Sequence, residues 1–135
     1  LTVVTNSLEI ANILSSSQTI HLFLIGGEYS HRTKSFEGSS THRSLKQYFF
    51  DKAFISCRSV DIEFGITDTS DTSAVIHHLA LSHAKQKYLV VDHSKLDKVS
   101  FTSVAPLSEL DGIVMDTEFS PEWKDFLDKN NIRYY

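Results

Sequence analysis

The sequence predicts an α/β fold in which a mainly parallel, Rossmann-like sheet lies between two layers of helices. Short apolar runs rich in β-branched residues alternate along the chain with longer amphipathic stretches. Most of these runs are apolar at consecutive positions rather than at alternate ones, which is typical of strands buried on both faces. Such strands, alternating with helices, form a parallel sheet that helices cover on both sides. The expected architecture is therefore a three-layer α/β/α domain.

The first half of the chain supplies three of the expected strands. After the first strand, either Asn6 or Ser7 is placed to cap a helix. The second strand stops at Gly26 and Gly27, and the segment from there to Gly38 is too long for a simple strand-to-helix turn. We expect that segment to fold over the edge of the sheet. The elements expected here are strands over 1–5, 20–25 and 52–57, a helix beginning at residue 8, and a helix over 40–50.

The second half repeats the alternation of strands and helices. Asp71 or Thr72 is placed to cap one helix, and a second helix begins at Ser120-Pro121-Glu122, where proline suits the first helical turn. The elements expected here are helices over 71–84 and 120–131, strands over 87–92, 112–116 and 132–135, and a short extended piece over 101–105.

Composition limits the class of protein. A chain of 135 residues suggests one domain over residues 1–135, and 41% hydrophobic with 22% charged residues is ordinary for a globular protein. The single cysteine, Cys57, excludes an intramolecular disulfide and fits the reducing cytoplasm. No apolar run approaches the roughly 20 residues of a membrane span, and no signal peptide is visible. The net charge of −4 argues against nucleic-acid binding by this segment but permits a small anionic ligand.

Candidate functional residues follow from the predicted topology. In open parallel sheets, ligands bind beyond the carboxyl ends of the strands. The residues that directly follow the predicted strands are therefore candidates: Asn6, Gly26–Gly27, Arg58–Asp61, Asp92–Lys95 and Asp116.

Each candidate has a structural interpretation beside the functional one. The two glycines either form a turn or bring backbone N–H groups close to a ligand. Asn6, with Thr5 before it, either caps a helix or contributes to an anion site at a helix start.

The sharper pattern is Asp92 with Lys95. A lysine is a good donor to phosphate and a carboxylate beside it can hold a sugar hydroxyl, but the two residues can also form a local pair with a capping serine. Asp61 and Thr67 lie on either side of Gly65 in a loop expected after the third strand, and Asp61 either belongs to the same site or forms a turn.

Metal and thiol chemistry are not expected. His77, His78 and His83 share a predicted helix, but no two of them are four residues apart, and no cysteine completes a zinc site. Cys57 has no histidine partner in sequence, so we expect a core residue rather than a nucleophile.

Taken in order, five segments resemble a known family. LTVVTNSLEIANIL, LIGGEY…FEG, DKAFISC…VDIEFGITD, VVDHSK and VAPLSELDGIVMD are similar to the C-terminal effector-sensing domain of DeoR-type bacterial transcriptional regulators, over nearly the whole chain. That family resembles the fold of sugar-phosphate isomerases, glucosamine-phosphate deaminases and coenzyme A transferases. Its members sense phosphorylated sugars or related metabolites and bind operator DNA through a separate N-terminal winged helix-turn-helix.

The resemblance implies an effector pocket and no cofactor, metal or catalytic residue. Carried over by position, the pocket residues are Thr5, Asn6, Gly26, Gly27, Asp61, Asp92 and Lys95. Lys95 would meet the phosphate or a sugar oxygen, Asp61 and Asp92 would read hydroxyls, and the double glycine would let the backbone approach the ligand.

The chain also departs from the family pattern. The DNA-binding half, the family's first strand and its phosphate loop are absent, so we expect a domain truncated at its N-terminus. Arg58–Ser59 stands where the family usually has a small residue and glycine, and Arg58 would narrow the pocket or add an anion contact.

These observations predict a sugar-phosphate-sensing domain of a cytoplasmic regulator, a repressor of carbohydrate uptake or metabolism that forms homo-oligomers. The alternative is an isomerase- or deaminase-like enzyme. Related isomerases supply a glutamate at the start of the helix after VDIEFGITD, where this chain has Ser73, although Asp61 or Asp71 could act as base instead.

Overall fold

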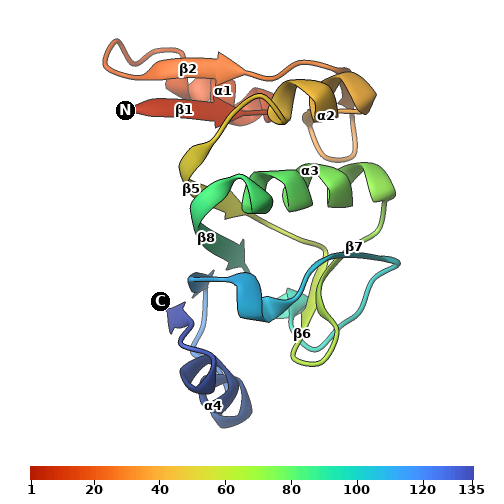
Figure 1. Ribbon diagram of the computed structural model, residues 1–135, viewed down its shortest axis with the longest axis vertical. Coiled ribbons are helices and arrows are strands. Elements are labelled where there is room, and N and C mark those ends of the chain that lie inside the picture. The colour runs from red at the N-terminus through yellow and green to blue at the C-terminus, as the bar shows by residue number, and fades with distance from the viewer. The chain divides into compact units, whose positions relative to one another are not determined.

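Two units make up the computed structural model, which describes residues 1–135: unit 1, Leu1–Tyr48, and unit 2, Phe49–Tyr135 (Figure 1). The prediction of an α/β fold with a mainly parallel sheet flanked by helices is confirmed. None of the helices combines the length and the apolar character needed to cross a membrane.

Unit 1 is built on two parallel strands. β1 (Thr2–Thr5) pairs with β2 (His21–Leu24), and α1 (Leu8–Leu14) connects them. Of the two expected helix caps, Ser7 is the one used, because its Oγ accepts a hydrogen bond from the Ile10 N–H at 3.3 Å.

The segment after Gly26 and Gly27 forms a hairpin that the sequence did not predict. β3 (Glu28–Ser30) and β4 (Ser35–Glu37) pair antiparallel. The Phe36 N–H donates to the carbonyl of Asn6 at 2.8 Å, so the hairpin is tied to the end of β1. The helix that follows, α2 (Ser39–Leu45), is shorter than predicted, because the aromatic residues after it lead into a strand.

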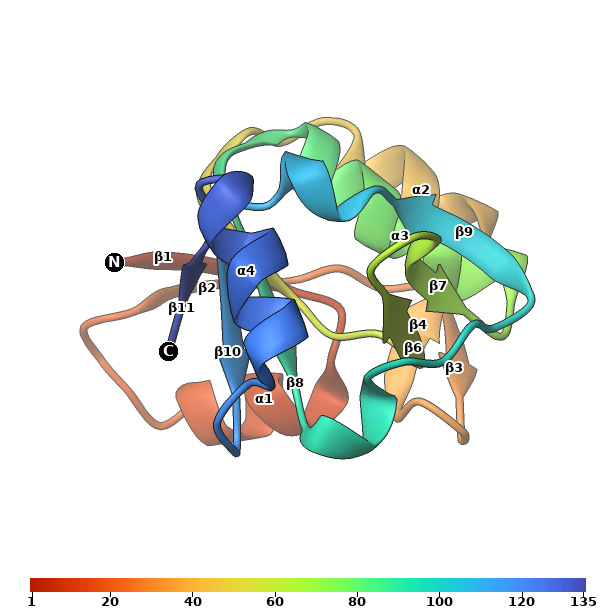
Figure 2. The same ribbon diagram turned by 90° about the horizontal axis from the view of Figure 1, so that it is seen from below.

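Unit 2 holds the central parallel sheet, in the order β11-β10-β8-β5. Its strands are β5 (Phe50–Ile55), β8 (Ala84–Val91), β10 (Gly112–Met115) and β11 (Arg133–Tyr134), and its helices are α3 (Asp71–Ser82) and α4 (Pro121–Lys129). α4 lies beside β11 (Figure 2). One buried cluster joins strand residues such as Leu89 and Ile113 to Leu81 of α3 and to Trp123 and Leu127 of α4. Burial of these side chains is the main stabilising contribution in unit 2.

A second, antiparallel sheet in unit 2 is formed by β6 (Ser59–Asp61), β7 (Gly65–Asp68) and β9 (Thr102–Ala105). The extended piece expected over 101–105 is present as β9, whereas the hairpin β6–β7 stands where the sequence predicts a loop. Two 3-10 turns complete the unit, η1 (His93–Lys95) and η2 (Leu107–Glu109). η1 directly follows β8 and carries Lys95 to the carboxyl edge of the parallel sheet.

Candidate functional site

The carboxyl edge of the parallel sheet gathers several of the predicted residues of unit 2. β5, β8 and β10 run in the same direction, so the residues that follow them lie at one edge. Asp92, His93 and Lys95 follow β8, and Asp116 follows β10. The paired positions Val60 and Leu96 place Asp61 beside the segment that follows Lys95.

Asp92 caps the turn that carries Lys95. One oxygen of its carboxylate, Oδ1, accepts hydrogen bonds from the backbone N–H of Ser94 at 2.9 Å and from the Ser94 hydroxyl. These bonds, with a smaller contribution from Lys95, hold the pKa of the Asp92 carboxyl below its usual value. Asp92 therefore stays ionised, and its second oxygen has no hydrogen bond from the protein.

The ammonium group of Lys95 has no hydrogen bond or ion pair in the structure, and the side chain is half-buried. It lies close enough to Asp92 and to Cys57 to influence both groups, yet it pairs with neither. A half-buried cation without a partner is suited to bind an anion that comes from outside the chain.

Cys57 is a core residue, as expected. Burial raises the pKa of its thiol to about 12, and the neighbouring Asp68 carboxylate contributes to the rise. A thiol with so high a pKa is a poor nucleophile at neutral pH.

Asp61 makes the turn between β6 and β7. Its Oδ2 accepts from the N–H groups of Glu63 at 2.9 Å and Phe64 at 3.0 Å. This is the turn-forming role considered from the sequence, and it leaves Oδ1 as the oxygen with which Asp61 can meet a ligand.

The predicted residues of unit 1 lie together at the carboxyl edge of β1 and β2. Thr5 Oγ1 accepts from the Ser7 N–H at 3.1 Å, and Asn6 Nδ2 donates to the carbonyl of Phe36 at 2.8 Å. Both side chains thus fix the start of α1 and the hairpin. These two bonds do not use the side-chain oxygen of Asn6 or the hydroxyl hydrogen of Thr5.

The two glycines have different surroundings. A Cβ on Gly27 would clash with the Oγ1 of Thr41 and come within 2.7 Å of the Glu37 carbonyl, so the close backbone approach at this position is to the chain itself. A Cβ on Gly26 would meet nothing within 4 Å, while the Gly26 carbonyl accepts from the Thr41 hydroxyl at 2.8 Å. Gly26 is the glycine whose backbone remains open to a ligand.

Two pairs of side chains at strand ends were not assigned from the sequence. Asp116 binds His93 with both carboxylate oxygens, and the buried Asp68 binds His77 Nδ1 at 2.7 Å and the N–H of Arg58 at 3.0 Å. Position after a strand singled out Asp116, but its partner could not be found without knowing that β8 and β10 are neighbours. Nothing in the sequence around His77, apart from its place in a predicted helix, indicated that it pairs with Asp68.

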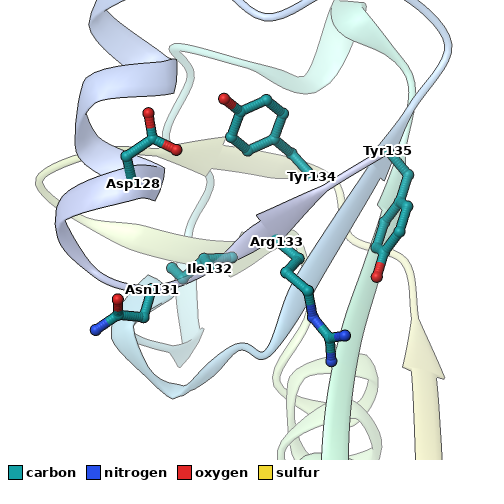
Figure 3. A pocket seen from close by; sticks show the side chains of 6 residues that line it. All are labelled: Asp128, Asn131, Ile132, Arg133, Tyr134 and Tyr135. Carbon is teal, nitrogen blue, oxygen red and sulfur yellow. The ribbon is translucent and has the colours of Figure 1, made fainter.

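A shallow pocket of about 670 Å³ lies elsewhere in unit 2, and none of the predicted site residues lines it (Figure 3). Its lining comes from the end of α4 and from β11: Asp128, Asn131, Ile132, Arg133, Tyr134 and Tyr135. It is wide open to solvent, so the residues that follow β8 and β10, together with Asp61, remain the better candidate site. We call this group, Asp61, Asp92, Lys95 and Asp116, the strand-end cluster. No three histidine, cysteine or acidic side chains are arranged to hold a metal ion.

Comparison with known proteins identifies the family. Residues 1–117 match the family described as DeoR C terminal sensor domain. The chain belongs to this family. The match extends over both units and includes the whole strand-end cluster, whereas α4 and β11 lie beyond it.

Curated relatives of this DeoR sensor domain are repressors by name. The chain is 42% identical over 120 residues to the lactose phosphotransferase system repressor of Staphylococcus aureus, which covers 87% of this chain and 47% of that protein. It is 38% identical over 118 residues to the repressor of the same name in Staphylococcus epidermidis, covering 86% and 47%. It is 34% identical over 131 residues to the HTH-type transcriptional repressor GlcR of Bacillus subtilis, covering 97% and 50%. The chain thus spans about half the length of these relatives.

Proposed function

We propose that this chain is the effector-sensing part of a DeoR-type repressor of carbohydrate uptake or metabolism, and that its effector is a phosphorylated sugar. The observation that carries the proposal is Lys95: a half-buried ammonium without a partner, beside an ionised Asp92, at the carboxyl end of a parallel strand in a sensor-domain family. The names of the relatives support a repressor, and two of them name the lactose phosphotransferase system as what is repressed.

The proposed effector contacts are Asp61, Asp92 and Lys95 in unit 2 and Thr5, Asn6, Gly26 and Gly27 in unit 1. Lys95 binds the phosphate or a sugar oxygen, and the oxygens of Asp61 and Asp92 that the protein leaves without a partner accept from sugar hydroxyls. Gly26 offers backbone to the ligand, whereas Gly27 keeps the local fold. Arg58, which is exposed, is a further candidate for an anion contact.

The partners follow from the family and from charge. The family implies that operator DNA is bound by a separate N-terminal segment of the intact protein, and the net charge of −4 of this chain argues against DNA binding by the chain itself. The intact repressor acts in the cytoplasm as a homo-oligomer, since two or more DNA-binding units on repeated half-sites bind more tightly than one.

Calorimetry on the intact protein tests the effector. Glucose 6-phosphate, fructose 6-phosphate, galactose 6-phosphate and ribose 5-phosphate are titrated, with the unphosphorylated sugars and inorganic phosphate as comparisons. We expect one sugar phosphate to bind well above its unphosphorylated form and above phosphate alone. Equal binding of a sugar with and without its phosphate contradicts the proposal, and turnover of the bound sugar phosphate favours the isomerase- or deaminase-like enzyme.

Lys95→Ala tests whether the phosphate of the effector binds at the carboxyl end of β8. Loss of one charge-assisted contact costs about 1.5–3 kcal/mol, which raises the effector Kd about tenfold or more. Lys98→Ala is the matched control, because Lys98 is an exposed lysine three residues further along the chain. If both variants bind as the parent does, Lys95 is not in the site.

A further inference from the structure

Asp116 holds the turn that carries Lys95. It follows β10, and its Oδ1 accepts from the backbone N–H of His93 at 2.7 Å while its Oδ2 accepts from His93 Nδ1 at 2.8 Å. Both bonds bridge the ends of neighbouring parallel strands, because His93 follows β8. The two bonds to His93 also hold the pKa of the Asp116 carboxyl below its usual value, so the carboxyl of this Asp116–His93 clamp is ionised at neutral pH.

The same turn is fixed at two further points. Asp92 caps its beginning through Ser94, as described above. After Lys95, Asp97 accepts a hydrogen bond at 2.9 Å from the indole Nε1–H of Trp123, which is buried in the core of unit 2. Hydrogen bonds that anchor the turn thus lie on both sides of Lys95, and none of them uses the Lys95 ammonium.

We propose that Asp116 and His93 are positioning residues for the effector, which act by fixing the turn from which Lys95 reaches the ligand. The inference rests on the proposed function, in which Lys95 contacts the phosphate. Neither Asp116 nor His93 needs to touch the ligand for this role.

The physical reason is the cost of ordering. A lysine side chain has many rotamers, and binding must restrict them at a cost in conformational entropy. If the turn that carries the lysine is itself loose, the ligand must also order the backbone, and its affinity falls. A turn fixed by two bonds to Asp116 removes that second cost before the ligand arrives.

Three variants of the intact protein test the clamp, with the sugar phosphate that calorimetry finds to bind most tightly. Asp116→Ala loses both hydrogen bonds to His93, and His93→Ala loses the side-chain bond. We expect each to raise the Kd about three- to tenfold. His93→Asn keeps a side-chain N–H near the position of Nδ1, and we expect it to restore most of the affinity.

Asp111→Ala is the matched control. The Asp111 carboxylate also bridges β8 and β10, since its Oδ2 accepts from the Lys87 N–H at 2.8 Å, but it lies at the opposite, amino edge of the sheet. The alanine variant loses this bond between the same two strands without touching the Lys95 turn, and we expect an unchanged Kd.

A double-mutant cycle separates positioning from direct contact. In a Lys95→Ala background, Asp116→Ala should have no further effect on the Kd, because the group that Asp116 positions is gone. Additive effects of the two changes, or an equal loss in Asp111→Ala, overturn the inference while leaving the proposed function intact. An intact protein that binds none of the sugar phosphates overturns both.

Discussion

The two units of the chain differ sharply in how much apolar surface they bury. Unit 2 has a continuous core in which Val60, Ile66, Leu89 and Ile113 are completely buried. In unit 1 the buried apolar side chains are those of Ala11, Ile25 and Leu45. Larger apolar side chains of unit 1 remain partly in solvent: Ile13 is 72% exposed, Phe23 47% and Leu24 43%.

This difference shows how rigidly each unit holds its own candidate residues. Lys95 and Asp92 stand on a parallel sheet with a full core, whereas Asn6 and Gly26 stand on a two-stranded sheet held by hydrogen bonds such as Asn6 to Phe36 and Thr41 to Gly26. A unit of 48 residues with so small a core is marginal by itself. Segments of low local stability are those that ligands most readily order.

The largest predicted effect compares the same substitution in the two units. Ile113→Ala removes a completely buried side chain and should lower the free energy of opening of β8 and β10 by about 2–5 kcal/mol. Ile13→Ala removes a side chain that is 72% exposed, and should change the opening of β1 and β2 by less than about 0.5 kcal/mol.

Amide hydrogen exchange of the intact protein, followed on peptides from each unit, measures both changes. An Ile13→Ala effect as large as that of Ile113→Ala would show that unit 1 buries Ile13 in solution, and the contrast between the units would fail.

A smaller effect is predicted at Gly27, where unit 1 is tightly packed despite its small core. In Gly27→Ala the new methyl group meets the Thr41 hydroxyl and the Glu37 carbonyl, and we expect a loss of about 1–3 kcal/mol in the opening of β1 and β2. Gly26→Ala is the neighbouring control, because its methyl group enters open space and should cost less than about 1 kcal/mol. Hydrogen exchange of the same peptides distinguishes the two variants. Equal losses in both would show that the close contacts of Gly27 with Thr41 and Glu37 do not limit the stability of unit 1.

The parallel sheet of unit 2 was predictable because its two middle strands contain runs of consecutive apolar residues, 88–91 in β8 and 113–115 in β10. The two hairpins, β3–β4 and β6–β7, were not, because their strands have three or four residues and contain Ser, Asp and Gly, which are poor indicators of a strand. They are held by local pairing and by single side chains such as Asn6 and Asp61.

For the site, the sequence indicated which residues follow strands, and the structure shows what their side chains already bind. The Asp92 cap is local, and its capping serine was among the interpretations considered. The Asp116–His93 clamp joins residues 23 positions apart and depends on the strand order, which periodicity does not reveal. The same holds for Asp68 and His77, which pair between β7 and α3.

A further prediction concerns the link between the Lys95 turn and α4, which lies beyond the family match. Asp97→Ala leaves the buried indole N–H of Trp123 without an acceptor and should cost about 1–2 kcal/mol in the opening of unit 2. Asp97→Asn keeps an acceptor oxygen, and asparagine tolerates the positive φ of 57° found here, so we expect a near-neutral effect. Similar losses in both variants would indicate that the charge of Asp97, rather than the bond to Trp123, is what matters.

The smallest predicted effect is the pH dependence of the two carboxylates that hold the Lys95 turn. In the folded chain the pKa of Asp92 is lowered by its bonds to Ser94, and the pKa of Asp116 by its bonds to His93. Because both values lie below those of the unfolded chain, the stabilisation is present above about pH 4 and is lost as the pH falls through the folded values. An NMR titration of the carboxyl carbons tests each cause separately. Ser94→Ala should raise the pKa of Asp92 and leave that of Asp116 unchanged. His93→Ala should raise the pKa of Asp116 more than that of Asp92. If either substitution shifts both carboxyls equally, the two anchors are not independent and the turn responds to acid as one unit.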